Sequence, residues 1–221
     1  MMKMKDDINV NLPLIIVGAS GFGKEVAWLA EECGVPVMGF ADDNPNITGQ
    51  KIYNYKVLGL LNGLTKFVDC QFVVAIGNPR LRKSIVEKLK SLNIQKFATL
   101  IHPSVQMSDT VVVGNGTVIC SGCILTVDIE IGEHCQINLS NTIGHDCSIE
   151  SFCTLAPQGV VSGNVTMNKG VEIGTGASIK QGVNIERGAM IGMGAIVVKN
   201  GDANTIYVGS PAKPLKKLEE F

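Results

Sequence analysis

The chain has 221 residues, of which 45% are hydrophobic, 18% charged and 5% aromatic, and its 19 basic and 20 acidic side chains leave a net charge of -1. The apolar fraction is too high and the net charge too small for a disordered chain, and the length allows one or two domains with a sizeable core. A charge balance this even, at a pI near 6.3, argues against partners that are held by bulk charge, such as nucleic acid or an anionic membrane surface.

The first residues and the cysteines favour a cytoplasmic protein. Met1–Asp7 carries two lysines that are followed at once by Asp6 and Asp7, unlike a secretory signal. The next apolar stretch, Leu12–Val17, is interrupted by Pro13 and is far too short for a membrane span. Seven cysteines is an odd number, which does not favour a disulfide framework, so we expect a reduced, cytoplasmic chain.

The first half of the chain is predicted to alternate strands and helices. Leu14–Val17 reads as a buried strand, followed by the glycine loop Gly18–Gly23 and by a helix that Gly34 ends. The apolar face of this helix is predicted to consist of Val26, Leu29, Ala30 and Cys33.

Two further strands and a second helix are predicted downstream. Val35–Phe40 is a strand that leads into Asp42 and Asp43, and Phe72–Ile76 is another. Pro79 opens a helix. The apolar face of that helix is predicted to consist of Leu81, Ile85 and Leu89. This order predicts a small Rossmann-like α/β domain over residues 1–100.

The glycine loop is a candidate phosphate site, because backbone N–H groups at a helix N-terminus attract anions. Its spacing is G-x-x-G-x-G, whereas dinucleotide sites have G-x-G-x-x-G, which disfavours a nicotinamide cofactor. Asp42 and Asp43 lie about 20 residues further on, at the end of the second predicted strand. A carboxylate at this place can accept hydrogen bonds from ribose hydroxyls. The alternative to a nucleotide-binding site is a tight turn followed by a solvated acidic loop. The candidate substrate-binding residues are Ser20, Gly21, Phe22, Gly23, Asp42, Asp43, Gly77 and Asn78.

From Ile101 to Val197 every sixth residue is aliphatic or methionine, and the residue four places after each of these is mostly small. This period fits neither a helix nor a simple strand. It predicts a parallel β-helix over residues 101–221, in which three short strands and three corners make one coil. About five and a half coils are expected, and the chain is expected to leave the prism after Val197. Four cysteines take small inward positions: Cys123, Cys135, Cys147 and Cys153.

The three histidines are the candidate bases near neutral pH. His102 precedes Pro103 at the boundary between the two halves, where we expect a turn. A zinc-dependent hydratase on the same prism is an alternative, but the spacings between His102, His134 and His145 are not whole numbers of coils, so the three side chains do not stack. We therefore expect no metal.

His145 has the surroundings that acyl transfer requires. Asp146 follows it, Asn138 lies seven residues earlier, and Gly163 lies one coil later, so that a backbone N–H is expected about one strand spacing from the imidazole. A base removes the proton of the attacking group, while an amide N–H stabilises the carbonyl oxygen of a thioester. Neighbouring strand residues point to opposite faces, so Asp146 reaches His145 only at a corner. An exposed polar corner without catalytic function is the alternative.

Along nearly its full length the sequence resembles a family of bacterial sugar O-acyltransferases, those of the sialic acid O-acetyltransferase (NeuD) and UDP-4-amino-sugar N-acetyltransferase (PglD) type. The matching stretches occur in the same order. They are Val17–Lys24, Asp42-Asp43, Ala75–Asn78 with Arg82, Leu100–Ser104, Gly144–Cys147, Gly163–Val165 and Gly209–Lys213.

The resemblance implies an N-terminal domain that holds a nucleotide-linked sugar and a left-handed β-helix that forms a homotrimer, with acetyl-CoA in the groove between neighbouring prisms. It implies that His145 is the general base and that Asp146 raises its basicity. Asn138 is then a substrate contact, and Gly163 provides the amide that faces the thioester carbonyl. The coenzyme contacts implied are Thr154, Gly163, Thr175, Gly176, Gly192 and Met193.

Two positions depart from the family pattern. Phe22 stands where the glycine loop often has a histidine, and Thr154 stands where a second histidine contacts the acetyl donor. We expect direct acetyl transfer to an amine or hydroxyl of an activated sugar, above all a 4-amino-4,6-dideoxy sugar. The alternatives are a sialic acid O-acetyltransferase, a non-catalytic trimer that binds a sugar nucleotide, the zinc hydratase, and last an oxidoreductase.

Overall fold

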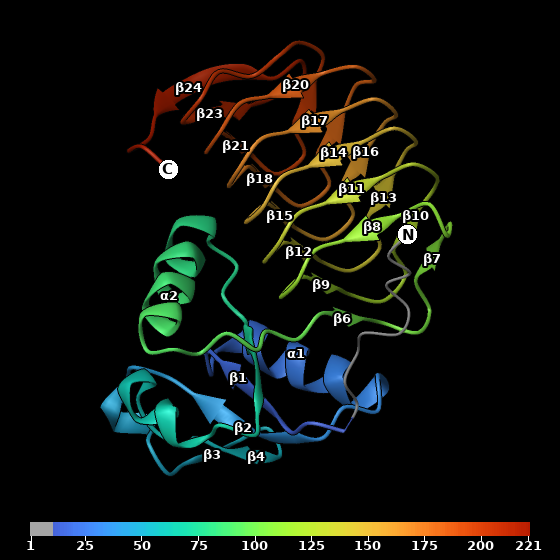
Figure 1. Cartoon of the computed structure of the whole chain (residues 1–221). Coiled ribbons are helices and arrows are strands. Elements are labelled where there is room, and N and C mark those ends of the chain that lie inside the picture. Colours follow the sequence, from blue (N-terminus) through green and yellow to red (C-terminus); the bar gives the residue numbers. More distant parts are fainter. Residues whose placement is uncertain (1–10) are drawn as a thin grey trace.

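The structure, a computed structural model, describes residues 11–221, so the predicted absence of a signal in Met1–Asp7 lies outside the described residues. Figure 1 shows an α/β part at one end of a long solenoid, with α1 running along the first coils and α2 standing beside the coils above it. Within residues 11–221 no helix has the length and apolar character needed to cross a membrane. The predicted fold class, a small Rossmann-like domain followed by a parallel β-helix, is confirmed.

The N-terminal part is built on a three-stranded parallel sheet of order β2-β1-β5. Its strands are β1 (Leu14–Val17), β2 (Val37–Ala41) and β5 (Gln71–Val74). Residues of β1 alternate between the two faces: Leu14 and Ile16 pack in the cluster with α1 (Gly21–Glu32), and Ile15 and Val17 in the cluster with α2 (Pro79–Ser91). The sheet therefore carries one helix on each face.

Between β2 and β5 the chain forms short elements that the sequence pattern did not reveal. These are the 3-10 helix η1 (Pro45–Ile47), the hairpin of β3 (Lys51–Ile52) and β4 (Tyr55–Lys56), and the 3-10 helix η2 (Leu61–Lys66).

The predicted apolar face of α2 is partly wrong. Leu81 is 51% exposed, whereas Pro79, Arg82, Val86 and Leu89 are buried. The reason is that α2 packs against the β-helix as well as against the sheet, and the side that meets the β-helix carries Arg82 instead of an aliphatic residue.

The β-helix consists of three parallel sheets, and each strand pairs with its equivalents one coil before and one coil after, as predicted. Thr154 pairs with Gln136 on one side and with Glu172 on the other. From Val113 to Val197 every sixth residue is at most 3% exposed, so these side chains fill the prism.

The six-stranded sheet holds β7 (Gln106–Met107), β10 (Ile124–Leu125), β13 (Thr142–Ile143), β16 (Val160–Val161), β19 (Ser178–Ile179) and β22 (Ile196–Val197). The five-stranded sheet holds β8 (Val112–Val113), β11 (Glu130–Ile131), β14 (Ser148–Ile149), β17 (Thr166–Met167) and β20 (Asn184–Ile185).

The eight-stranded sheet continues beyond the coils that the repeat predicted. Its strands are β6 (Leu100–Ile101), β9 (Val118–Ile119), β12 (Gln136–Ile137), β15 (Thr154–Leu155), β18 (Glu172–Ile173), β21 (Met190–Ile191), β23 (Thr205–Val208) and β24 (Lys213–Lys217). The expectation that the chain leaves the prism after Val197 is wrong in this respect. Tyr207 of β23 pairs with Ile191 and is 8% exposed, so an aromatic ring closes the end of the core.

Each coil turns three corners, and these place the candidate residues. The first corner joins the eight-stranded to the six-stranded sheet and comprises residues 138–141 and their equivalents one or more coils away, such as 174–177 and 192–195. The second corner joins the six-stranded to the five-stranded sheet, at 144–147 and 162–165. The third corner, at 132–135 and 150–153, leads back to the eight-stranded sheet.

All seven cysteines are free thiols. The four predicted to point inward are at most 2% exposed, which confirms their packing role. The sequence also contains one C-x-x-C pair, Cys120 and Cys123. Their side chains pack in different clusters, Cys120 in the cluster with α1 and Cys123 inside the β-helix, so this pair is structural as well.

Candidate functional site

His145 and Asp146 lie together at the second corner. The Nδ1 atom of His145 is 2.7 Å from Oδ2 of Asp146, and the two side chains are 52% and 58% exposed. Asp146 has a φ of 57°, a left-handed conformation that turns its side chain toward the side of its neighbour. A carboxylate on Nδ1 leaves Nε2 free to accept a proton and stabilises the imidazolium that results.

Gly163 lies directly against the imidazole of His145, one coil further on. A Cβ atom at Gly163 would lie 2.6 Å from Nε2 and 2.7 Å from Cε1 of His145, so only glycine leaves room for the ring. The backbone N–H of Gly163 donates to no group among residues 11–221. An exposed base and an unpaired amide donor, which belongs to a glycine buried against the ring of that base, thus meet at one corner.

Asn138 does not join this pair within the chain. It lies at the first corner, where its Nδ2 donates to the carbonyl of Leu155 at 3.2 Å. Within one chain β13 runs between the two corners, so the role of Asn138 as a substrate contact stays a prediction.

Four of the six candidate coenzyme contacts, Thr175, Gly176, Gly192 and Met193, gather at the first corner. Thr175 and Met193 occupy equivalent positions in successive coils, and the N–H of Gly194 donates to the carbonyl of Thr175 at 2.8 Å. Met193 is 78% exposed, and Gly176 is exposed beside it. Gly192 lies under Val208 of β23. The six-stranded sheet therefore separates these four residues from His145, whereas Gly163, also a candidate coenzyme contact, lies against the imidazole.

Thr154 is a correction to the predicted coenzyme contacts. It is 5% exposed, its Oγ1 donates to the carbonyl of Gly77 at 2.7 Å, and the same oxygen accepts from Nη2 of Arg82 at 2.9 Å. The outward face of β15 is covered by the N-terminal part, so this hydroxyl holds the two parts together and does not face an open groove.

The glycine loop opens α1 in the way a phosphate site requires. Gly23 lies so close to the carbonyl of Gly18 that a Cβ would collide with it, which explains the glycine. Ser20 is the N-cap, is exposed and makes no side-chain capping bond. The N–H groups of Gly21 to Gly23 in the first turn have no intrahelical acceptors. Phe22 packs its ring partly into the cluster beneath α1, so only its backbone faces the loop.

The two predicted acidic residues face different partners. Asp42 accepts from the N–H of Ala19 and from the N–H of Asn44, each at 2.9 Å, so its carboxylate adjoins the glycine loop. Asp43 turns instead toward Lys88 of α2, with Oδ2 2.7 Å from Nζ. Partial burial opposes ionisation, yet the hydrogen bond from Lys88 keeps the pKa of Asp43 below its ordinary value. We retain only Asp42 as a nucleotide contact.

Gly77 and Asn78 follow β5 at the same sheet edge as the glycine loop. A Cβ on Gly18 would lie 2.9 Å from the carbonyl oxygen of Ala75, so the two segments touch. The Oδ1 of Asn78 accepts from the N–H of Leu81 at 3.0 Å and caps α2. The carbonyl of Gly77 points inward to Arg82, at 2.9 Å.

The three histidines occupy three different corners. His102 lies at the first corner, where its Nδ1 is 2.8 Å from Oγ of Ser104, consistent with the predicted turn. His134 lies at the third corner, is 1% exposed and stacks on Phe152 with ring centres 5.3 Å apart. No group of three metal-ligating side chains is present among residues 11–221.

Burial gives His134 a measurable effect on stability. Desolvation, together with the charges of Lys90 and Arg82, lowers its pKa from 6.5 to about 4. The unfolded chain therefore binds more protons between these pH values, and the free energy of unfolding falls as the pH drops from 6.5 toward 4. We expect this fall to be about 2 kcal/mol smaller in His134→Leu, measured by urea unfolding at pH 6.5 and 4.5. Equal falls in both proteins would contradict the assignment.

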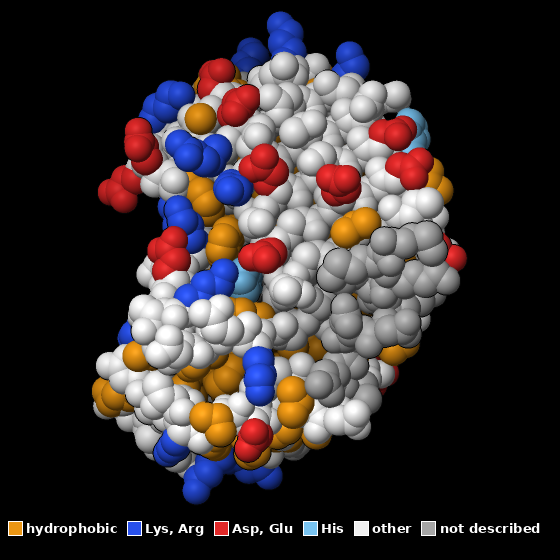
Figure 2. Space-filling model, in the orientation of Figure 1, with side chains coloured by type: hydrophobic (Ala, Val, Ile, Leu, Met, Phe, Trp, Pro, Cys, Tyr) orange, Lys and Arg blue, Asp and Glu red, His pale blue; other side chains and the backbone are white. Residues whose placement is uncertain are grey.

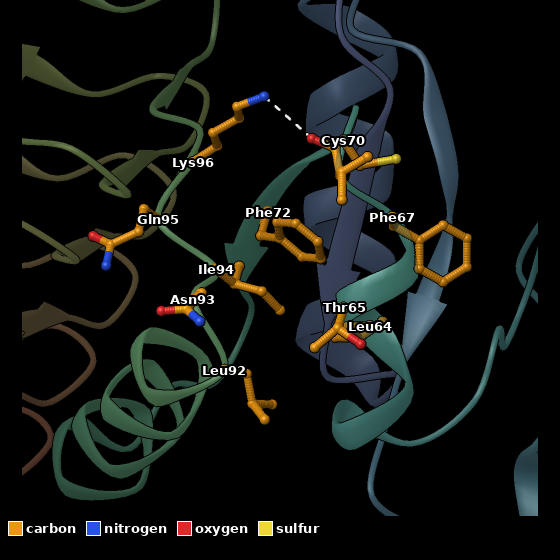
Figure 3. Close-up of a pocket in the computed structure, with 11 residues that line it drawn as sticks. Leu64, Thr65, Phe67, Cys70, Phe72, Leu92, Asn93, Ile94, Gln95 and Lys96 are labelled. Atoms are coloured by element: carbon orange, nitrogen blue, oxygen red, sulfur yellow. Dashed lines mark hydrogen bonds between the residues drawn. The ribbon is translucent and has the colours of Figure 1, made fainter.

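A cavity in the N-terminal part lies away from all these residues. It has a volume of about 400 Å³ and is shown in Figure 3. Leu64, Phe67, Phe72, Leu92 and Ile94 line it at the start of β5, the sheet edge opposite the glycine loop. Burial raises the pKa of the Cys70 thiol in its wall, so this thiol is a weak nucleophile.

Comparison with known proteins agrees with this geometry. Residues 13–89 match the family described as PglD N-terminal domain. A GDP-perosamine N-acetyltransferase from Escherichia coli is 31% identical over 167 residues, which cover 72% of this chain and 74% of that protein.

Two solved structures have the same fold over most of the chain. PerB from Caulobacter crescentus, in complex with CoA and GDP-perosamine, is 28% identical, with a TM-score of 0.86 over 92% of this chain and 97% of that one. The acetyltransferase domain of PglB from Neisseria gonorrhoeae, in complex with acetyl coenzyme A, is 29% identical, with a TM-score of 0.85 over 92% and 98%. From the coverage and identity of these relatives, we conclude that the chain belongs to the hexapeptide-repeat sugar N-acetyltransferases with a PglD-type N-terminal domain.

Proposed function

We propose that this enzyme transfers the acetyl group of acetyl-CoA to the amino group of a nucleotide-linked 4-amino-4,6-dideoxy sugar, with His145 as general base. The observation that carries the proposal is the imidazole held by Asp146 on one side and lying against Gly163 on the other. The relatives support the substrate class, since PerB was solved with CoA and GDP-perosamine.

The reaction follows from the atoms at the second corner. The sugar amine attacks the thioester carbonyl and forms a C–N bond, and Nε2 of His145 takes the proton that the amine loses. Negative charge develops on the carbonyl oxygen, where the free N–H of Gly163 donates a hydrogen bond. The C–S bond then breaks, and the CoA thiolate leaves with the proton that the imidazolium returns. Asp146 stabilises the imidazolium during this cycle.

A homotrimer unites the two half-sites. The six-stranded sheet presents Ile124, Val160 and Ile196 outward, each more than 40% exposed, an apolar surface that a second copy can cover. If three copies turn this sheet toward a common axis, the first corner of one copy meets the second corner of the next. Thr175 and Met193 then face a neighbour's His145 across one groove, which suits the pantetheine arm of acetyl-CoA. Sedimentation in solution measures the mass of the assembly and therefore the number of copies in it.

The nucleotide is proposed to bind at the glycine loop, with its phosphates at the N–H groups of α1 and its ribose at Asp42. The cytoplasmic location and the limits 1–100 and 101–221 for the two domains stay predictions.

Asp42→Ala is expected to raise the KM for the sugar nucleotide by about tenfold, because a hydrogen bond to a charged group contributes about 1.5–3 kcal/mol. The KM for acetyl-CoA stays nearly unchanged, since that ligand rests on the β-helix. Steady-state kinetics with each substrate varied in turn measures both values. Asp69→Ala is the control, because Asp69 is exposed just before β5, at the opposite sheet edge. An equal rise in both KM values would contradict the layout.

The proposed function is tested by CoA release from acetyl-CoA with a panel of acceptors. GDP-perosamine, UDP-linked 4-amino sugars and free sialic acid are offered in parallel, and mass spectrometry identifies the product. Acetylation of a nucleotide-linked amino sugar is expected. Acetylation of sialic acid alone indicates the O-acetyltransferase. Nucleotide affinity without turnover indicates a binding protein, and both outcomes overturn the proposal.

A further inference from the structure

Arg82 is the only charged side chain among the largest fully buried residues of the described chain, and no step of the reaction uses it. It is 1% exposed and lies where α2 meets the β-helix. Figure 2 shows basic side chains around the notch on this side of the molecule. Burial lowers its pKa to about 10, so the guanidinium remains charged at neutral pH.

The guanidinium bonds to both parts of the chain at once. Nη1 donates to the carbonyls of Ile76 and Gly77, at 2.7 and 2.9 Å, in the loop that follows β5. Nε donates to the carbonyl of His134 at 2.8 Å, and Nη2 donates to the carbonyl of Phe152 at 2.7 Å, both on the β-helix. Nη2 also donates to the carbonyl of Cys153 and to Oγ1 of Thr154.

None of these partners is a carboxylate. A buried ion pair explains most fully buried arginines, whereas here a planar fork of donors is matched only by backbone carbonyls and one hydroxyl. Such an array fixes the relative position of two backbones, because each donor direction is set by the plane of the guanidinium. Thr154 completes it by donating to the carbonyl of Gly77 at 2.7 Å.

The loop held in this way touches the proposed nucleotide site. Ala75 contacts Gly18 of the glycine loop, and the next residue of that loop, Ala19, donates its N–H to Asp42. A continuous series of contacts therefore runs from the β-helix through Thr154, Arg82 and the loop 75–78 to the nucleotide crevice.

We propose that Arg82, together with Thr154, is a positioning residue for acetyl transfer: it sets where the acceptor-binding crevice stands on the β-helix that carries the base. This inference rests on the proposed function. It also gives Thr154 a role that differs from the coenzyme contact suggested by the family pattern.

The test compares three substitutions at this joint in the full-length protein. Thr154→Val keeps the shape and removes the hydroxyl, so the carbonyl of Gly77 keeps only Arg82 as its donor. Thr154→Ser restores the hydroxyl. Gln136→Met is the matched control, because Nε2 of Gln136 also bridges the joint, at 2.8 Å, but bonds to the carbonyl of Val74, the last residue of β5, and not to Gly77 in the loop.

We expect Thr154→Val to lower kcat about tenfold, since a displacement of about 1 Å at a reacting centre costs up to 10²-fold. KM for acetyl-CoA and the affinity for GDP-perosamine, measured by calorimetry, should stay within about twofold, because each ligand keeps its own contacts. Thr154→Ser should recover at least half of the wild-type kcat and Gln136→Met should retain it. Arg82→Lys should lower kcat about 100-fold, because an ammonium cannot match the planar fork.

The outcomes separate this inference from the proposed function. If the wild type acetylates an amino sugar and Thr154→Val and Gln136→Met have equal kcat, the joint is only a structural contact and the inference is overturned. The inference is also overturned if kcat falls in parallel with the melting temperature in every variant. Failure of the wild type with every acceptor overturns the proposed function instead.

Discussion

His145→Ala is expected to lower kcat by about 10²- to 10⁴-fold, the contribution that a positioned general base makes. The imidazole is the one side chain at the second corner whose nitrogen can take a proton from the acceptor amine near neutral pH, and Asp146 holds it by its other nitrogen at 2.7 Å. KM for acetyl-CoA should change little, because most of the proposed coenzyme contacts lie at the first corner. CoA release measured with a thiol reagent gives kcat directly.

His102→Ala is the matched control, since His102 lies at the first corner and its side chain bonds within its own turn, to Ser104. It should retain wild-type kcat. A kcat of His145→Ala within a few fold of the wild type would remove the imidazole from the mechanism, and a loss in both variants would point to a general effect on the β-helix.

The β-helix was predictable from the sequence because its core repeats. Each inward side chain stacks on its equivalent in the next coil, so the apolar pattern is copied from coil to coil and is visible without knowledge of any partner. Only the ends of the array departed from the pattern. Tyr207 continues the core outside the six-residue period, because β23 reaches the stack through a longer connection.

The site was predictable where its residues are related by one coil. Gly163 stands one whole coil after His145, so the spacing itself placed the two in contact, and the structure brings them together. Asn138 lies apart from His145 within one chain, because the seven residues between them cross β13 from the first corner to the second. Arg82 and Thr154 were both named from the family pattern, but their place at the joint was missed, because most of their partners are backbone carbonyls, which leave no pattern in the sequence. The position of Arg82 three residues after the buried Pro79 and four before Val86 is the one indication that it lies on the inner face of α2.

Gly163→Ala is expected to lower kcat by about 10- to 100-fold although the change adds only a methyl group. The new Cβ would lie 2.6 Å from Nε2 and 2.7 Å from Cε1 of His145, closer than carbon and nitrogen atoms approach, so the imidazole must turn away. The backbone N–H remains, and Gly163 is not among the glycines with positive φ, so alanine fits its backbone and the melting temperature should stay within about 3 °C. Gly63→Ala is the control, because a Cβ there meets nothing within 4 Å.

Combining the two substitutions separates displacement of the ring from other effects of the added methyl group. If Gly163→Ala acts only by moving the imidazole, it costs nothing further once the imidazole is gone, and His145→Ala/Gly163→Ala should have the kcat of His145→Ala alone. If the two losses multiply instead, the methyl group disturbs something other than the base, such as the direction of the Gly163 N–H or access of the thioester to it. The first result ties the glycine to the imidazole as one catalytic unit, and the second would require the amide to be treated as a separate contribution.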